Sequence, residues 1–548
     1  MKNKLVSLIY LIIFISGFTV LVENDIYYEV SKNLEIFSKI YKEITFNYVD
    51  EINSTEFIKS GIEGMLKNLD PYTIYLDDNK KSDIDIMTNG KYGGIGVSIG
   101  ILNNAVRITE VMEGYPGHKG GLKVGDIILE VDGFKVSVEK YDEVSPRVKG
   151  EPGTQLELKI LRNNLKDTIT LNFIREEILL KSLYFYSFFP KNSGIVYLKL
   201  NNFNKAAASE IQKAIKRLRS EREIQSVILD LRGNPGGLLE SAIEVTDKFL
   251  PKNILIVSTK GRDLNSEKKY FANEEPILKN EKLVVLIDEN SASASEILAG
   301  AIQDHDRGII LGTNSFGKGL VQTVTPITKD VSLKITTARY YTPTGRCIQK
   351  IDYSKENKVV KIKDDNKSSS DYFTDNYRKV FSSGGIQPDT IVENNFKNEF
   401  ISELYAQGII YEYLDFYIQN KTNEQFEIEN DKNLYKDFYG FFIKKLDNLV
   451  LETNKTFLSF KKKLEKDSLD IVLNKELNLI EQKIKDFTFK LLEKNKNNIV
   501  GLLRIELTKR YHNTYKSLEE SLKYDNQVLT ALELLSNDKV YQKLLNRN

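Results

Sequence analysis

A serine and a lysine are the residues of this chain whose types and spacing most strongly indicate chemistry. Ser293 lies in the run Asn-Ser-Ala-Ser-Ala-Ser-Glu, and Lys318 lies in Phe-Gly-Lys-Gly, 25 positions later (318 − 293). A serine hydroxyl becomes a nucleophile when a base takes its proton, and a neutral lysine can be that base. Because a free lysine has a pKa of about 10.4, such a site must lower it to near 7, which burial can do.

The three histidines of the chain are poor partners for this serine. His118 lies in a glycine-rich turn, His512 lies in a polar helical stretch, and His305 stands beside two aspartates at a charged helix end. Lys318 instead precedes the apolar stretch 320–324, which is expected to be a core strand and to supply burial. A surface hairpin lysine is the alternative interpretation.

Two strand-turn-helix units position the candidate residues. The apolar stretch 283–287 predicts a buried strand and 296–302 opens an amphipathic helix, so the serine run occupies the turn between them. At such a turn a nucleophile is exposed beside helix amides. Ser293 and Glu296 also fit a capping box, in which the hydroxyl only satisfies a helix amide.

The second unit has a strand over 226–231, the turn Arg-Gly-Asn-Pro-Gly-Gly over 232–237, and a helix from Leu238. A Pro-Gly-Gly turn at a helix start presents bare backbone amides, which suit an oxyanion hole or a phosphate. The chain has neither a Walker lysine motif nor Gly-x-Gly-x-x-Gly here, so a nucleotide site is not indicated.

In chain order, the motifs resemble those of the C-terminal processing peptidases, or tail-specific proteases. They are Asp-Leu-Arg-x-Asn-Pro-Gly-Gly, Ser-Ala-Ser-Ala-Ser-Glu, Phe-Gly-Lys-Gly-x-Val-Gln, Ala-Arg-Tyr-Tyr-Thr-Pro-x-Gly-Arg and Gly-Gly-Ile-x-Pro-Asp. The similarity spans roughly residues 30–395 and is specific in combination. It implies that Ser293 is the nucleophile, that Lys318 is the general base and that Gln322 orients the lysine.

The same resemblance implies an oxyanion hole formed by the Ala294 amide and by an amide at Gly236 or Gly237. The sequence leaves the choice between these two glycines open. Asp304 matches an acidic position of some members, and we expect it to be a structural salt-bridge partner.

A segment before the candidate core is similar to a PDZ domain. It reads Tyr-Gly-Gly-Ile-Gly-Val, then Gly-x-x-Gly-Gly-Leu-Lys-Val-Gly-Asp, then Gly-x-Pro-Gly-Thr. Free amides of Gly94, Ile95 and Gly96 would hold a terminal carboxylate, and the bound peptide would add as an extra strand. A small β-domain whose glycines only form turns is the alternative. Lys149 stands where many relatives carry arginine, which would weaken any bidentate contact.

Composition narrows the remaining function classes. A formal net charge of +1 over 548 residues gives no electrostatic footprint for nucleic acid. The single cysteine forbids an internal disulfide and a cysteine-based zinc site. We expect no metal and no cofactor.

The N-terminus indicates export. A basic start is followed by an apolar or weakly polar run over residues 5–22, 18 positions long, without a clear Ala-x-Ala cleavage site. Because this length reaches the lower limit for spanning a bilayer, an uncleaved anchor is favoured over a removed signal peptide. The resemblance is to bacterial members of the family, which implies that the catalytic part lies in the periplasm or cell envelope, possibly anchored in the inner membrane.

The predicted fold class is α+β multidomain: an α/β peptidase core with an inserted PDZ domain and an α-helical C-terminal domain. The expected boundaries are 1–24 for the signal peptide or anchor, 25–85 for an N-terminal helical region, 86–177 for the PDZ domain, 178–398 for the core and 399–548 for the helical domain. Within the core, the charged and serine-rich residues 352–383 predict a surface excursion.

The expected function is that of an exported serine endopeptidase that binds C-terminal tails of protein substrates through the PDZ domain and cleaves with a Ser-Lys dyad. The alternative is a noncatalytic PDZ scaffold or chaperone built on a peptidase-like core. Expected partners are protein substrates with accessible tails and the membrane through the N-terminal segment, with no nucleic acid. The C-terminal helices leave a homo-oligomer or an adaptor open.

Overall fold

The computed structural model describes residues 26–77, 86, 88–162, 168–263, 266–353, 360, 361, 372–382, 384–419, 433–446, 449, 451–466, 468–512 and 514–545. The predicted signal or anchor segment, 1–24, lies outside this set. Among the described residues, no helix combines the length and apolarity needed to cross a bilayer. The described residues form two compact units, the first consisting of 26–77, 322–336 and 353 and the second of the other described residues.

The first unit combines helices with part of a β-hairpin. A helix covers residues 26–47, and α2 (Ser54–Leu66) follows. The side chain of Asn53 caps α2 by accepting hydrogen bonds from the second and third amides of that helix. β1 (Ile74–Leu76) pairs antiparallel with residues 332–334 of strand β18.

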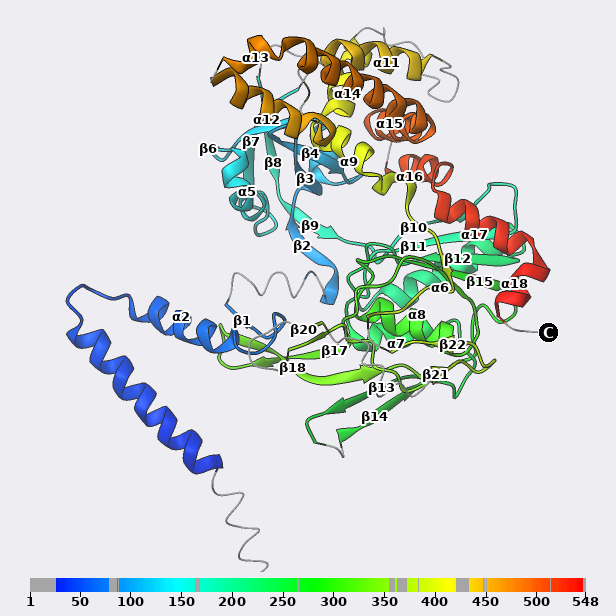
Figure 1. The fold of residues 1–548 in the computed structure, drawn as a ribbon. Coiled ribbons are helices and arrows are strands. Elements are labelled where there is room, and N and C mark those ends of the chain that lie inside the picture. Colours follow the sequence, from blue (N-terminus) through cyan, green and yellow to red (C-terminus); the bar gives the residue numbers. More distant parts are fainter. Residues whose placement is uncertain are drawn as a thin grey trace, which may run out of the picture. The chain divides into compact units, whose positions relative to one another are not determined.

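A six-stranded sheet lies at the centre of the second unit (Figure 1). Its strands, in spatial order, are β10 (Leu183–Phe188), β11 (Ile195–Leu200), β12 (Ser226–Asp230), β15 (Lys282–Ile287), β16 (Ile309–Gly312) and β23 (Thr390–Ile391). β10 runs antiparallel to β11, and the other pairs are parallel. Because the carboxyl ends of parallel strands share one edge of a sheet, the turns after β12 and β15 are neighbours.

Helices cover both faces of this sheet (Figure 1). The first face packs against α6 (Ala207–Glu221), α7 (Leu239–Asp247) and α8 (Ala294–Asp304). The second face packs against α16 (Thr514–Leu522), α17 (Asn526–Ser536) and α18 (Asp538–Leu544). Successive side chains of β12 alternate between the two cores, which explains why the strand is buried throughout. The sequence did not predict that the last helices of the chain cover the central sheet.

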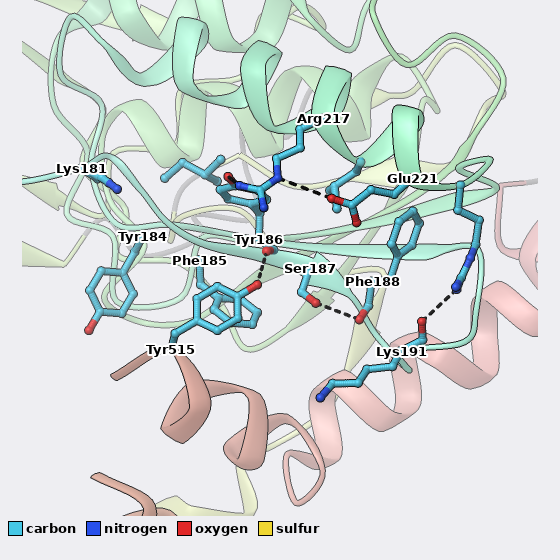
Figure 2. A pocket seen from close by; sticks show the side chains of 13 residues that line it. Lys181, Tyr184, Phe185, Tyr186, Ser187, Phe188, Lys191, Arg217, Glu221 and Tyr515 are labelled. Atoms are coloured by element: carbon cyan, nitrogen blue, oxygen red, sulfur yellow. Dashed lines mark hydrogen bonds and ion pairs between the residues drawn. The ribbon is translucent and has the colours of Figure 1, made fainter. Parts of the chain in front are cut away.

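The outer edge of β10 borders a cavity of about 500 Å³ (Figure 2). Tyr515 of α16 donates its hydroxyl to the carbonyl oxygen of Tyr186 at 2.8 Å, and Glu210 accepts the amide of Leu183 at 2.8 Å. These contacts satisfy backbone hydrogen-bonding groups that an unpaired edge strand would otherwise expose to solvent. Because β10 is at the sheet margin, this cavity is separated by β11 from the turn after β12.

A second sheet flanks the core and includes β13 (Leu255–Gly261), β14 (Lys268–Phe271), β18 (Ser332–Tyr341) and β17 (Leu320–Pro326). The expectation of a core strand over 320–324 is wrong. Only Leu320 is buried, and the rest of β17 is half or fully exposed. The physical reason is that only the start of β17 reaches the core of the central sheet, through Val321, while residues 323–326 of this edge strand are exposed.

The remaining strands of the core are short ribbons. They are β19 (Ile351–Asp352) with β20 (Val360–Lys361), and β21 (Tyr372–Phe373) with β22 (Lys379–Val380). Much of the predicted excursion over 352–383 lies outside the described residues.

A separate β-structure has the arrangement expected for the PDZ segment. Its sheet contains β3 (Val97–Leu102), β4 (Ala105–Val111), β5 (Ile127–Val131), β7 (Gln155–Leu161) and β8 (Thr168–Ile174), with β6 (Phe134–Lys135) paired to β5. α4 (Pro116–Lys119) and α5 (Tyr141–Val148) complete it, with the 3-10 turn η1 (Val138–Lys140) before α5. A ribbon of β2 (Lys91–Gly94) and β9 (Glu176–Leu179) leads into and out of this domain.

The C-terminal region is helical. It contains the 3-10 turn η3 (Asn395–Lys397), α9 (Glu399–Ala406), α10 (Ile409–Gln419), α11 (Leu434–Lys445), α12 (Glu452–Lys466), α13 (Leu469–Val472), α14 (Asn474–Lys494) and α15 (Lys496–Tyr511). Helices α9, α10, α11, α14 and α15 share a core rich in aromatic side chains, such as Tyr413, Phe438 and Phe442. The predicted fold class, an α+β multidomain protein with an α/β core, is confirmed.

Candidate active site

Ser293 occupies a strained turn between β15 and α8. It is the residue before the helix and has φ 54° and ψ −111°, a conformation that non-glycine residues rarely adopt. Its side chain is oriented toward the backbone amide of Glu296. That amide already donates a hydrogen bond to the carbonyl oxygen of Ser293 at 2.9 Å. Ser293 is half-buried, so its hydroxyl lies at a turn that solvent reaches.

The carboxylate of Glu296 joins the serine turn to the lysine loop. Its Oε2 accepts the amide of Ser293 at 2.8 Å and the amide of Lys318 at 2.9 Å. The two amide nitrogens therefore lie no farther apart than the sum of these distances. Oε1 accepts the amide of Gly317 at 2.7 Å and the hydroxyl of Ser315 at 2.6 Å.

Glu296 is fully buried. None of the four groups that donate these hydrogen bonds is a cation. Burial raises the pKa of its carboxyl group, and the donors from Ser315, Lys318, Gly317 and Ser293 oppose that rise. Sequence reasoning identified Glu296 only as a helix cap and missed that it organises the site. The Ser-x-x-Glu spacing was the available signal, but its burial was not visible in the sequence.

Hydrogen bonds fix the loop that carries Lys318 both before and after the lysine. The hydroxyl of Ser315 accepts the amide of Ile386 at 2.6 Å, and the amide of Gly319 donates to Gln349 Oε1 at 2.6 Å. Lys318 itself is half-buried. Its partial burial arises from this loop packing and not from a core strand after it.

A second anchor for the serine turn is Tyr340 of β18. Its ring is buried, and its hydroxyl donates to the carbonyl oxygen of Ser293 at 3.2 Å. This residue was also missed from the sequence, although it lies within the Ala-Arg-Tyr-Tyr motif.

The turn after β12 lies against the serine turn. A Cβ placed on Gly236 would stand 2.9 Å from the Ala294 amide nitrogen and 2.9 Å from Ser293 Cβ, so only glycine permits this approach. The amide of Gly236 donates to Asn234 Oδ1 at 2.9 Å. For the amides of Ala294 and Gly237, the described part of the chain contains no hydrogen-bond acceptor.

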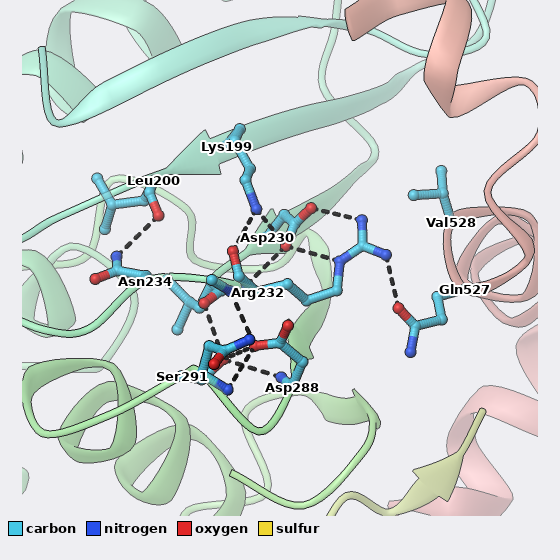
Figure 3. A network of polar contacts seen from close by, with 12 residues as sticks. Lys199, Leu200, Asp230, Arg232, Asn234, Asp288, Ser291, Gln527 and Val528 are labelled. Atoms are coloured by element: carbon cyan, nitrogen blue, oxygen red, sulfur yellow. Dashed lines mark hydrogen bonds and ion pairs between the residues drawn. The ribbon is translucent and has the colours of Figure 1, made fainter. Parts of the chain in front are cut away.

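Asn234 links the two turns (Figure 3). It is buried, and its side-chain amide donates to the carbonyl oxygen of Leu200 at 2.8 Å. Its own carbonyl oxygen accepts the amide of Ala292 at 3.1 Å and the hydroxyl of Ser295 at 2.9 Å. The glycine turn and the serine turn are therefore one hydrogen-bonded structure.

Asp230 supports the glycine turn from the end of β12. Its carboxylate accepts two hydrogen bonds from the Arg232 guanidinium, at 3.0 and 2.6 Å, and one from Tyr197, and it forms an ion pair with Lys199 at 3.2 Å. Burial alone would raise the pKa of this carboxyl group, but the charges of Arg232 and Lys199 hold it below its usual range. Asp230 is therefore ionised and structural.

The histidines are placed as expected for residues without a catalytic role. His305 ends α8, about 18 Å along the helix axis from Ser293 at 1.5 Å per residue. Its ring nitrogens contact Asp375 and the Leu255 carbonyl oxygen, each at 2.8 Å. His118 lies in α4 of the PDZ segment, and His512 ends α15.

Two other predicted residues have identified contacts. Gln322 lies in β17, where its side-chain amide donates to Thr336 Oγ1 at 3.3 Å, and its role toward the lysine stays a prediction. Asp304, expected to be a salt-bridge partner, pairs with Arg346 at 2.5 Å, with both side chains buried.

In the PDZ segment, Ile95 and Gly96 lie between β2 and β3 beside a cavity of about 40 Å³ that α5 also lines. Within the described residues, neither of their amides has an acceptor, as expected for a carboxylate-binding loop. Gly94 lies in β2 opposite Glu176 of β9, so it belongs to a ribbon and not only to a free loop.

Lys149 stands over the ring of Tyr92 at 5.8 Å. Nearby, the buried Arg175 holds the end of α5, donating to the carbonyl oxygens of Arg147 at 2.7 Å and Val148 at 3.1 Å. The forked contacts of an arginine are thus made here by Arg175, which lies between β8 and β9 and was not singled out from the sequence.

Comparison with known families agrees with this geometry. Peptidase family S41 matches residues 194–359, and a PDZ domain family matches residues 107–162. The family described as probable PDZ-protease, C-terminal helical domain matches residues 400–535, and that of the activating protease CtpB N-terminal domain matches residues 19–80.

Individual relatives extend the match. A carboxy-terminal-processing protease of Bartonella bacilliformis is 38% identical over 323 residues, which cover 58% of this chain and 73% of the relative. The carboxy-terminal processing protease CtpB of Bacillus subtilis is 29% identical over 59% of this chain and 67% of its own. Among solved structures, a photosystem II D1 C-terminal processing protease has a TM-score of 0.37 at 25% identity, covering 65% of this chain and 86% of that one. This chain belongs to the carboxy-terminal-processing proteases of peptidase family S41, and it is a serine peptidase with a PDZ domain.

Proposed function

We propose that this protein is an exported endopeptidase that binds the C-terminal tail of protein substrates and cleaves them with a dyad of Ser293 and Lys318. One observation carries the proposal: the same oxygen of buried Glu296 accepts the amides of both residues. This arrangement supports a shared site because the serine turn and the lysine loop cannot separate without leaving a buried carboxylate short of donors.

In the proposed mechanism, Ser293 Oγ attacks the carbonyl carbon of the scissile bond while Lys318 Nζ, in its neutral form, takes the hydroxyl proton. The lysine then gives this proton to the leaving amine, and an acyl-enzyme forms. Water, deprotonated by the same lysine, hydrolyses the ester and regenerates the serine. Gln322 is proposed to orient the lysine.

The oxyanion of the tetrahedral intermediate needs two donors that are not otherwise used. We assign them to the amides of Ala294 and Gly237. Gly237 is favoured over Gly236 because the Gly236 amide already donates to Asn234. Ala294 is the first residue of α8, so the helix dipole adds to its attraction for a negative oxygen.

Selection of substrate tails is assigned to the groove between β3 and α5. Its lining includes Ile95 and Gly96, whose amides are suited to a terminal carboxylate. An export segment at residues 1–24 would place the enzyme in the periplasm or cell envelope. Its basic start and apolar run support this location.

A reporter protein ending in a free apolar C-terminus should be cleaved about tenfold faster or more, in kcat/KM, than the same reporter amidated at its end. Hydrogen bonds to a charged acceptor contribute about 1.5–3 kcal/mol, and a neutral amide cannot reproduce them. Cleavage rates of the two reporters by the full chain provide the measurement, with Ser293→Ala as the blank.

Two glycine variants identify the groove as the source of this preference. Gly96→Ala should remove it, because φ is +73° and a Cβ would stand 2.6 Å from Tyr115 Cβ. Gly133→Ala is the matched control: φ is +76°, but no heavy atom lies within 4 Å of the added Cβ. Equal cleavage of free and amidated tails by the unmodified enzyme would reject tail recognition while leaving the peptidase assignment intact.

A further inference from the structure

The glycine turn, residues 232–237, forms hydrogen-bonded contacts with the C-terminal helix α17 (Figure 3). Arg232, the first residue of the turn, donates from Nη1 to Gln527 Oε1 at 2.6 Å, and its Nη2 forms an ion pair with Asp525 at 2.8 Å. Arg232 and Gln527 are 295 positions apart in the chain. These contacts join the end of the chain to the turn that carries Gly236 and Gly237.

Asp525, at the start of α17, gives Arg232 a second carboxylate partner beside Asp230. Arg232 and Lys199 are two cations, and Asp230 and Asp525 are two carboxylates. The Arg232 side chain is only 10% exposed, and that of Asp525 is 15% exposed. Without Asp525, Arg232 keeps Asp230 as a partner but loses the carboxylate that joins it to α17, which leaves a buried guanidinium with fewer acceptors.

α17 is itself firmly fixed at this point. Asp525 caps it by accepting the amides of Gln527 at 3.0 Å and Val528 at 3.2 Å. The side-chain amide of Gln527 donates to the carbonyl oxygen of Val392 at 2.6 Å. Val528 packs in the core beneath the catalytic sheet. The helix start is therefore a rigid support and not a loose surface contact.

On its other side the turn touches the serine turn directly. The amide of Gly233 donates to Asp288 Oδ1 at 2.9 Å, and Ser291 Oγ donates to the carbonyl oxygen of Leu231 at 2.9 Å. The carbonyl oxygen of Arg232 accepts a hydrogen bond from Lys199 at 2.6 Å. Displacement of Arg232 would therefore be transmitted to the residues between Leu231 and the glycines.

We propose that Asp525 and Gln527 are positioning residues for catalysis, which hold Arg232 and so fix the oxyanion-binding amide of the glycine turn. The C-terminal segment 514–545 is thus a part of the catalytic apparatus. The inference rests on the proposed function, since it assigns an oxyanion donor to this turn. A misplaced donor weakens binding of the transition state more than binding of the substrate, so the effect falls on kcat.

The variants Asp525→Asn and Gln527→Ala test this assignment in the full-length chain. Asn is as good a helix cap as Asp, so Asp525→Asn keeps α17 while removing the charge opposite Arg232. We expect each variant to lower kcat by about tenfold to 10²-fold with KM nearly unchanged, since a misplacement of about 1 Å at a reacting centre can cost about 10²-fold. The double variant should cost little more than the worse single variant, because both act through one guanidinium.

Tyr541→Phe is the matched control. The buried Tyr541 hydroxyl bonds to the amide and carbonyl groups of Leu283, at the opposite end of β15 from the serine turn. This variant loosens the same helical segment without touching Arg232, so it should keep its kcat even where its thermal stability falls as far as that of Asp525→Asn.

Hydrogen exchange of residues 231–238 gives a second readout that does not depend on activity. Exchange there should rise in Asp525→Asn and Gln527→Ala and stay at the unmodified level in Tyr541→Phe. Unchanged exchange and unchanged kcat in the two α17 variants would overturn the positioning role. Increased exchange without loss of Ser293-dependent turnover would also overturn it, because the turn would then move without consequence for catalysis. Failure of the proposed function is seen separately, as turnover that persists in Ser293→Ala.

Discussion

Ser293→Ala and Lys318→Ala are each expected to lower kcat by at least about 10³-fold, to near the background rate, while the protein still folds. Removing a nucleophile or its base leaves only the contributions of oxyanion binding and substrate positioning. Lys318→Arg should be equally inactive, because a guanidinium keeps its proton and cannot serve as a base. Cleavage of a reporter with a free apolar tail, with thermal unfolding of each variant, is the measurement.

Histidine variants serve as the controls. His118→Gln, His305→Gln and His512→Gln should retain turnover, since none of these side chains belongs to the serine site. Turnover that survives Lys318→Ala and is lost with one of the histidines would remove the dyad. A folded wild-type protein that binds tails but shows no Ser293-dependent cleavage would favour the noncatalytic scaffold.

Glu296→Gln is expected to lower kcat on the order of 10²-fold and to destabilise the fold by about 2–4 kcal/mol. Oε2 of the carboxylate accepts the amides of Ser293 and Lys318. Oε1 accepts the amide of Gly317 and the hydroxyl of Ser315. Whichever way the new amide is oriented, its NH₂ group faces donors. The serine turn and the lysine loop should then separate, which kcat and thermal unfolding measure together.

Glu240→Gln is the matched control for this substitution. Glu240 also lies in the first turn of a helix that packs on the sheet, but its side chain is exposed. It should change neither kcat nor stability by a measurable amount, since exposed charges near helix ends contribute less than about 1 kcal/mol. Wild-type kcat in a folded Glu296→Gln protein would show that the shared carboxylate does not assemble the site.

The elements around the site could be predicted from the sequence because their patterns are local. The apolar runs over 226–231 and 283–287 form β12 and β15, and the helix expected from Glu296 forms α8. In a parallel sheet with short connections, these strands bring their following turns to one edge. The family motifs then identified the peptidase, and the comparisons confirm that identification.

Local sequence patterns predicted burial wrongly where burial depends on which other elements pack against a segment. The run 320–324 was expected to be a core strand, yet only its start reaches the core: Val321 packs against it, and residues 323–326 are exposed. Glu296 shows the converse: a charged residue at a helix start reads as an exposed cap, yet it is fully buried. Hydrophobic periodicity reports the conformation of a segment, and neighbouring elements decide its surroundings.

The sequence by itself predicted the chemical groups of the candidate site: a serine on a strand-to-helix turn, a lysine between glycines and a glycine turn that offers backbone amides. Only the tertiary structure decided how they are held together. The shared carboxylate of Glu296 and the attachment of Arg232 to α17 join segments 22 and 295 positions apart. Such contacts depend on how separate elements dock, because buried charges and amides must find partners wherever the fold brings them, and no spacing along the chain encodes those partners.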